Sequence, residues 1–448
     1  MKKHVLMFLV LAAAIQILTS CNDEYVGIKE LTGANSFNQI SPKESRIRKR
    51  NTVLIYMAAD NSLESYAIDN KTNLLNGYAP SANDDEDVLL LYFDIQNTAP
   101  VLERITSNGS ATSEEILKTY PESQNSASDT TLNEVLTDAK LLFPASRNGL
   151  VLWSHGNGWL PTGYYYDPEN FTSFSMTSRS STLESSPAYA VGREYFPPLE
   201  EDPYRNFVKS FAEHDGSEID IPQLADALPQ YYDYIIFDAC LMGGVEIAYE
   251  LKDKCSYIAF SPAEVLGDGL ISYGSAMQYL FDEDYSVDAA LEKILQDGFD
   301  YYDSQTGTYQ SSTVSLVRCS ALDSLASSCK SIFSAHRQEL NDGISEISLQ
   351  GYFRFNRHWF FDLEDFIKSL ATTDELISFE NALSNTVIYK ESTPAFLSFT
   401  INTYCGLSSY VYEPSSTYLN AFYETLLWND ATGMVPQISG TYLNSTVK

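Results

Sequence analysis

Short apolar runs recur along the chain, separated by longer stretches of mixed character. Five of these runs are only four to seven residues long, at residues 53–59, 88–93, 149–154, 234–237 and 257–260. They are apolar on both faces, which is typical of parallel β-strands that helices cover on each side. A further strand is expected at residues 313–317.

Helical periodicity occupies the stretches between these strands. It predicts helices at residues 129–142, 221–228 and 244–251, and another around residues 288–295. The alternation of strand and helix predicts a doubly wound α/β core. From about residue 345 onward, aromatic and β-branched residues are frequent, so we expect a mixed α+β region packed on that core. The chain is therefore divided into a core domain (51–340) and a C-terminal region (341–448).

The N-terminus has the pattern of an export signal. Met1-Lys-Lys-His is followed by an apolar run at residues 5–18 and by Leu18-Thr-Ser-Cys21, which resembles a bacterial lipobox. Residues 1–20 are predicted to be a lipoprotein signal peptide, and Cys21 to carry the lipid. The alternative is an ordinary secretory signal with a chance cysteine. The lipid would anchor the protein to the outer membrane of a bacterial envelope. The acidic residues after Cys21 resemble those of many lipoproteins displayed on the surface of Bacteroidota, a resemblance that implies surface exposure.

Residues 21–50 are polar and lack periodicity, which predicts a tether. The tether ends in a basic run at residues 46–50 that is either a solvated flank or a processing site. No later segment contains 18 consecutive apolar residues, so no transmembrane helix is expected.

Composition excludes one class of partner. The 448 residues carry a formal net charge of −32. Nucleic acids require clustered Lys and Arg to neutralise their phosphates, so a nucleic-acid-binding function is excluded. Beyond Cys21 the chain has Cys240, Cys255, Cys319, Cys329 and Cys405. An odd number leaves at least one thiol unpaired unless two chains are bridged, and none of the spacings is typical of a zinc site.

Two reactive side chains follow consecutive predicted strands. His155 comes directly after the strand at 149–154, and Cys240 lies three residues beyond the strand at 234–237. In open α/β sheets, reactive groups collect at the carboxyl ends of the strands, so both side chains are expected at one edge. A thiol nucleophile needs a base and an acid, and a histidine supplies both. Taken singly, Cys240 could be a buried structural thiol and His155 a turn residue.

Three motifs resemble those of the clostripain-type cysteine peptidases, which belong to the caspase-like group. They are residues 51–64, His-Gly-Asn-Gly-Trp at 155–159 and Asp-Ala-Cys-Leu-Met-Gly-Gly-Val-Glu at 238–246. A weaker similarity continues through residues 403–414. The resemblance implies a caspase-like α/β/α sandwich with a mostly parallel central sheet, followed by a C-terminal α+β region.

The resemblance also implies roles for individual residues. His155 matches the catalytic histidine and Cys240 the nucleophile, with the backbone N–H groups of Gly156 and Cys240 forming the oxyanion hole. The family cleaves after Arg or Lys through acids in its S1 pocket, and these match Asp238 and Asp268. Two carboxylates suit a guanidinium best. The alternatives are a helix N-cap for Asp238 and a turn acid beside Gly269 for Asp268.

Members of the family are often zymogens that cut themselves after a basic residue between the histidine and the cysteine. The long connection at residues 160–215 offers Arg179, with Arg193 and Arg205 as alternatives. Some members use calcium and others do not, so calcium stays open; no other cofactor and no metal ligand set is expected.

The prediction is therefore an exported, lipid-anchored thiol protease that cleaves protein or peptide substrates after Arg, with cleavage after Lys left open. The alternative is a surface-binding lipoprotein, inactive or weakly active, built on a peptidase-like scaffold.

Overall fold

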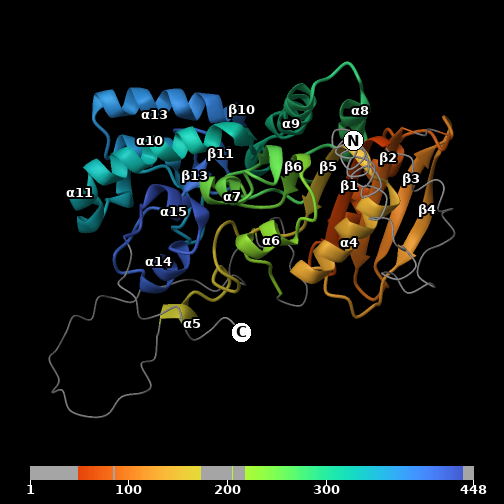
Figure 1. Ribbon diagram of the computed structural model, residues 1–448, viewed down its shortest axis with the longest axis horizontal. Helices are drawn as coiled ribbons and strands as arrows, with labels where there is room; N and C mark the ends of the chain where they lie inside the picture. The colour runs from red at the N-terminus through yellow and green to blue at the C-terminus, as the bar shows by residue number, and fades with distance from the viewer. Residues whose placement is uncertain (1–48, 84–85, 173–203, 205–216, 437–448) are drawn as a thin grey trace, which may run out of the picture.

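A sheet of nine strands forms the centre of the molecule (Figure 1). The computed structural model describes residues 49–83, 86–172, 204 and 217–436, and all statements below concern these residues. The sheet has the strand order β10-β8-β7-β6-β5-β1-β2-β3-β4. Its strands are β1 (Lys49–Ala59), β2 (Asp87–Ile95), β3 (Val101–Ser107), β4 (Thr112–Thr119), β5 (Ala145–Trp153), β6 (Tyr232–Asp238), β7 (Cys255–Phe260), β8 (Thr313–Arg318) and β10 (Val387–Ser392).

The five central strands, β2, β1, β5, β6 and β7, run parallel, and the pairings outside them are antiparallel. They are the five apolar runs that the sequence pattern predicts. Residues 53–59 of β1 are at most 3% exposed, as expected for a strand with covered faces on both sides.

Helices pack on the sheet in two sets. One set contains α3 (Glu64–Asn76), α8 (Tyr273–Phe281) and α9 (Val287–Asp303), and the other α4 (Asp129–Leu142), α6 (Ile221–Ala227) and α7 (Val245–Glu250). In Figure 1, α8 and α9 lie above the strands, and α4 and α6 lie below them. The predicted helices at 129–142, 221–228 and 244–251 are present, and the one around 288–295 extends to residue 303.

The C-terminal part combines helices with short strands, and it extends the main sheet through β10. Its helices are α10 (Leu322–Ala335), α11 (Arg337–Asp342), α12 (Leu363–Lys368), α13 (Thr373–Thr386), α14 (Thr417–Tyr423) and α15 (Leu427–Thr432). Two small ladders pair β9 (Phe361–Asp362) with β13 (Ser408–Ser409) and β11 (Ala395–Phe396) with β12 (Phe399–Thr400). The short elements that remain are α5 (Glu169–Thr172), η5 (Gly307–Tyr309), η6 (Cys319–Ala321) and η7 (Glu346–Ser348). The predicted α/β class, with a mostly parallel central sheet and a C-terminal α+β region, is confirmed.

A buried carboxylate joins the C-terminal part to α7, the helix that follows Cys240. Glu246, only 1% exposed, accepts hydrogen bonds from the Tyr423 hydroxyl (2.7 Å), the Tyr410 N–H (2.8 Å) and the Ser409 hydroxyl (3.2 Å). Burial raises the pKa of this carboxyl group, and the hydrogen bonds oppose that shift. The segment that follows Cys240 is thereby fixed from the C-terminal side.

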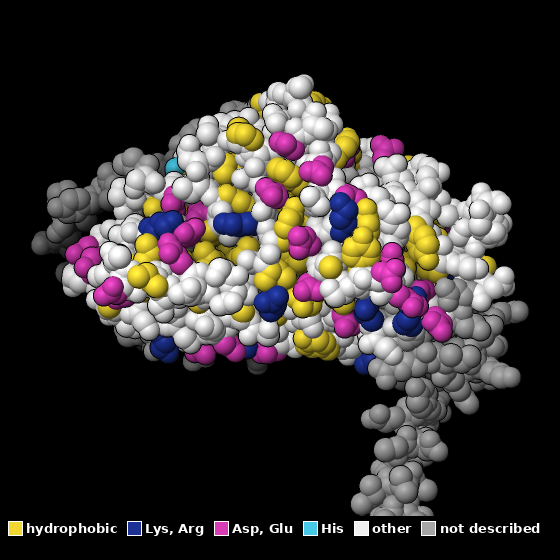
Figure 2. All heavy atoms as spheres, turned by 90° about the horizontal axis from the view of Figure 1, so that it is seen from above, with side chains coloured by type: hydrophobic (Ala, Val, Ile, Leu, Met, Phe, Trp, Pro, Cys, Tyr) yellow, Lys and Arg dark blue, Asp and Glu magenta, His cyan; other side chains and the backbone are white. Residues whose placement is uncertain are grey.

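The surface agrees with the acidic composition. On the face that lies uppermost in Figure 1, Asp and Glu side chains are spread widely with Lys and Arg between them (Figure 2). Within the described ranges, no helix has both the length and the apolar character needed to cross a membrane.

Candidate active site

The register of β5 and β6 places the two predicted reactive residues side by side. Trp153 pairs with Asp238 at the ends of these parallel strands. His155 and Cys240 each lie two residues beyond that pair. The next residue, Gly156, touches the Cys240 backbone: a Cβ on Gly156 would lie 2.0 Å from the Cys240 carbonyl oxygen. Only glycine allows this approach, so the structure brings the predicted pair of segments into contact.

The His155 ring is nearly buried and has a defined hydrogen-bond partner. Its exposed fraction is 6%, and its Nε2 lies 2.9 Å from the hydroxyl oxygen of Ser62. Ser62 belongs to the turn between β1 and α3. The sequence stretch 51–64 contains Ser62, but nothing in the residue pattern distinguishes it from an ordinary turn serine.

The Cys240 thiol faces the backbone of Val265. The Val265 N–H donates to Sγ at 3.0 Å, and the thiol in turn lies 3.5 Å from the Val265 carbonyl oxygen. The Cys240 side chain is only 2% exposed.

The residue after the cysteine has an unusual backbone. Leu241 has φ +61°, a left-handed conformation that non-glycine residues seldom adopt. Its N–H donates to the Ala263 carbonyl oxygen at 2.8 Å. Gly243 makes a similar bond to Ser261 at 2.7 Å. These two bonds hold the strained turn that presents Cys240 against the 261–268 segment.

Asp238 is fully buried and supports the loop that follows. Its carboxylate accepts from the Leu270 N–H (2.7 Å) and from the Tyr273 hydroxyl (2.8 Å). Gly269, directly before Leu270, has φ +106°, and a Cβ there would lie 2.7 Å from Asp238 Oδ2. The helix that follows, α7, begins at Val245 and not near Asp238. Asp238 therefore does not cap α7.

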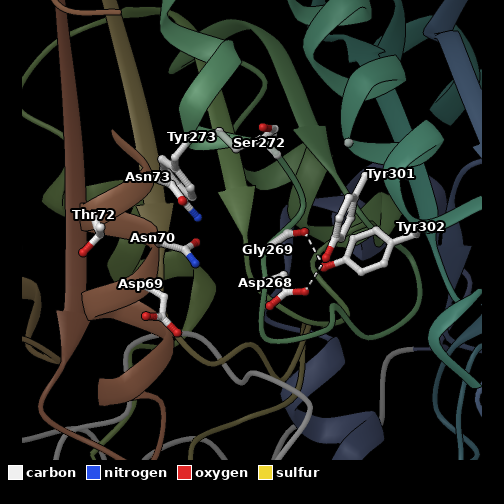
Figure 3. Close-up of a pocket in the computed structure, with 12 residues that line it drawn as sticks. Asp69, Asn70, Thr72, Asn73, Asp268, Gly269, Ser272, Tyr273, Tyr301 and Tyr302 are labelled. Atoms are coloured by element: carbon white, nitrogen blue, oxygen red, sulfur yellow. Dashed lines mark hydrogen bonds between the residues drawn. The ribbon is translucent and has the colours of Figure 1, made fainter. Parts of the chain in front are cut away.

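A cavity of about 340 Å³ lies beside this loop, between α3 and α9 (Figure 3). Asp268 lies on one side and accepts from the Tyr301 hydroxyl at 3.0 Å. Burial and this bond raise the pKa of Tyr301. Asn70 lies on the other side and accepts from the Trp153 indole N–H at 3.3 Å. The cavity is lined by Asp69, Asn70, Thr72, Asn73, Asp268, Gly269, Ile271, Ser272, Tyr273, Gly298, Tyr301 and Tyr302.

Both predicted S1 acids thus lie at the same wall of this cavity. Asp268 is exposed on the cavity wall, and Asp238 lies behind Gly269 of the same wall. Asp69, on α3, adds a third carboxylate that sequence reasoning missed. It was missed because an acid on the exposed side of a polar helix has no distinguishing pattern.

A buried ion pair anchors the segment between Cys240 and the cavity. The Arg354 guanidinium donates to both carboxylate oxygens of Glu264, at 2.6 and 2.9 Å, and both side chains are 4% exposed. Glu264 directly precedes Val265, whose N–H reaches the Cys240 sulfur. The C-terminal part therefore fixes the segment that follows Cys240, through Glu246, and the segment that bonds to the Cys240 sulfur, through Arg354.

The lipidation and processing candidates, Cys21, Arg179, Arg193 and Arg205, fall outside the described residues. Of the other histidines beyond the export signal, His214 also falls outside them. His336 is bonded to Glu375 at 3.0 Å, and His358 stacks on Phe353 with ring centroids 4.4 Å apart.

The described cysteines are all free thiols, and the sulfurs of Cys255 and Cys319 are 3.7 Å apart. In the part of the chain that the structure describes, no three His, Cys, Asp or Glu side chains gather in a way that could hold a metal ion.

A family model identifies the protein family to which this arrangement of residues belongs. The model of the Clostripain family matches residues 55–187 and 200–431, which include His155, Cys240, Asp238 and Asp268. The chain belongs to the clostripain family. It is therefore a hydrolase, and more narrowly a cysteine endopeptidase. No protein with a curated description matches the chain.

Solved structures of clostripain-family proteases share the fold. An inactive zymogen of a C11 protease from Parabacteroides distasonis is 30% identical, with a TM-score of 0.69 over 86% of this chain and 98% of that one. A secreted C11 cysteine protease from Bacteroides thetaiotaomicron, in complex with an irreversible peptide inhibitor, is 22% identical, with a TM-score of 0.66 over 86% and 99%.

Proposed function

We propose that this clostripain-family protein is an exported, lipid-anchored endopeptidase that cleaves after Arg, and also after Lys, with Cys240 as nucleophile and His155 as its acid–base partner. The observation that carries the proposal is the contact of Gly156 with the Cys240 backbone, which joins the two strand ends.

The reaction follows from the two side chains. His155 takes the thiol proton as the Cys240 sulfur attacks the scissile carbonyl carbon. The developing oxyanion is stabilised by the N–H groups of Gly156 and Cys240. His155 then protonates the leaving amine, and the acyl group stays on the sulfur as a thioester. A water molecule, deprotonated by His155, releases the carboxylate product and restores the thiol.

The specificity proposal rests on the charges around the cavity. Asp268 and Asp69 present carboxylates on its walls, and the buried Asp238 lies behind Gly269. A planar guanidinium pairs with carboxylates in a bidentate manner that an ammonium cannot match, so Arg is the preferred residue before the cut.

The location and activation of the enzyme are proposed from the sequence. The segment 1–20 would be removed, Cys21 lipidated and the protein held on the outer membrane by the tether. Self-cleavage after Arg179 would convert a zymogen into the active form. The low exposure of Cys240, 2%, is compatible with an unprocessed state.

One experiment tests the enzyme proposal. Residues 22–448 are produced without the lipid, and reporter peptides ending in Arg, Lys or Asp are supplied, with calcium or with a chelator. We expect cleavage after Arg and, more slowly, after Lys, and none in Cys240→Ala. If nicked protein shows no thiol-dependent cleavage both with calcium and with the chelator, the result would favour the inactive binding scaffold. Mass spectrometry of the same samples checks for a cut between Arg179 and Ser180.

A further inference from the structure

The turn that carries Ser62 is built onto the strand end that carries His155. The Ala58 carbonyl oxygen, at the end of β1, accepts from the Asn61 side-chain amide (3.0 Å) and from the Ser154 hydroxyl (2.7 Å). Ser154 directly precedes His155. One carbonyl oxygen therefore fixes both segments relative to each other.

Hydrogen bonds to Asn61 also stabilise this turn. The Asn61 side-chain oxygen accepts from the Leu63 N–H at 2.9 Å, which is a local Asx turn around Ser62. The Gln96 side chain donates to the Asn61 carbonyl oxygen at 3.2 Å. Ser62 is exposed, but its backbone is held on both sides, so its hydroxyl group has a defined position 2.9 Å from His155 Nε2.

We propose that Ser62 is a positioning residue for His155, whose hydroxyl oxygen accepts the Nε2 proton and leaves Nδ1 as the basic atom of the ring. This inference rests on the proposed catalytic role of His155. When the ring takes the thiol proton, both nitrogens carry hydrogen, and the bond to Ser62 then stabilises the imidazolium ion. Ser62 thus acts on the tautomer, the orientation and the charge of the base without touching the substrate.

Other titratable groups lie on the segments around His155. Asp60 precedes Ser62 by two residues, Cys240 packs against Gly156, and Glu218 accepts from the Asn157 amide at 2.6 Å. These groups are unchanged in Ser62→Ala, so the difference between this variant and the parent protein reports the hydroxyl group alone.

The test follows the titration of the His155 ring by NMR in histidine-labelled protein comprising residues 22–448. The His155 signal is identified by its loss in His155→Ala. We expect Ser62→Ala to lower the pKa of His155 by about half a unit to one unit, because the imidazolium loses a hydrogen-bond acceptor. Ser62→Asp should raise it, because a carboxylate stabilises the cation more strongly.

Two further variants separate positioning from a general structural effect. Ser62→Thr keeps the hydroxyl group and should titrate like the parent protein. Ser65→Ala removes a hydroxyl from an equally exposed serine in the adjoining helix and should change nothing. With an Arg reporter peptide, Ser62→Ala should lower kcat/KM about threefold to tenfold with little change in KM, and Ser62→Thr should restore it.

The NMR readout does not depend on catalysis, so a failure of the proposed function can be told from a failure of this inference. Unchanged His155 titration in Ser62→Ala would overturn the inference, whatever the result for Ser62→Asp, because a carboxylate also acts on the ring through its charge alone. Should Ser62→Ala not fold, Ser62→Gly also lacks the hydroxyl group and should lower the pKa of His155 in the same way, so it decides the question.

Discussion

At the scale of single residues, the two exposed carboxylates of the cavity are expected to contribute unequally to specificity. Asp268 is oriented by the Tyr301 hydroxyl at 3.0 Å and follows the segment that holds the thiol, whereas Asp69 lies on α3. We predict that Asp268→Asn lowers kcat/KM for an Arg reporter peptide about tenfold. The variant loses one charge-assisted hydrogen bond to the substrate, whose strength is limited because Asp268 is exposed to solvent. Asp69→Asn should cost about threefold or less.

The control for these variants is Asp300→Asn, an exposed acid on α9 outside the cavity. It removes the same charge and should leave kcat/KM unchanged. Equal losses in all three variants would mean that net charge matters and the cavity does not, and the specificity assignment would then be wrong.

At the scale of elements, the ion pair between Glu264 and Arg354 is expected to link the C-terminal part to the thiol segment. Both side chains are nearly buried, so removing one partner leaves an uncompensated charge. Arg354→Met should lower the free energy of unfolding by about 3–5 kcal/mol. It should also slow the alkylation of Cys240 by a peptide electrophile, because the Val265 N–H would lose its fixed position.

Urea unfolding measures the first effect and the alkylation rate the second. The double variant Glu264→Gln with Arg354→Met removes both charges and should recover part of the stability, as expected for coupled neighbours. A single variant that unfolds like the parent protein would contradict the link.

The elements also show what the sequence pattern could reveal. The central strands were predictable because both of their faces are buried, which leaves a continuous apolar run. The edge hairpin of β3 and β4 was not predictable, because β4 is mostly exposed and its charged residues interrupt any apolar run. Helix α3 was missed because it buries only Ala67, Asn70 and Leu74.

The site residues that could be predicted are likewise those next to buried strands. His155 and Cys240 were found because each follows a recognisable strand, whereas Ser62 and Asn70 lie in polar stretches whose contacts arise only in the folded chain.

At the scale of the whole molecule, buried acids with raised pKa values predict a loss of stability in alkali. Burial raises the pKa of the Cys329 and Cys405 thiols, and raises the pKa of buried tyrosines such as Tyr56, Tyr352 and Tyr423. In the unfolded chain these thiols titrate near pH ~8.5 and the phenols near ~10. The native state thus keeps protons that the unfolded state releases, so stability falls as pH rises through these unfolded values.

Each retained proton costs about 1.4 kcal/mol per pH unit, so the two thiols lower the free energy of unfolding by up to about 3 kcal/mol between pH 7.5 and 9.5. The tyrosines make the fall steeper above pH 10. Urea unfolding at several pH values measures the slope. A Cys329→Ala, Cys405→Ala double variant should make the fall less steep from about pH 8.5 upward, by about 1.4 kcal/mol per pH unit for each thiol removed, because the native thiols keep their protons throughout this range. Cys255, whose pKa is also raised by burial, and the tyrosines account for the slope that remains. The same slope in the variant below pH 9.5 would assign the alkaline loss to other groups.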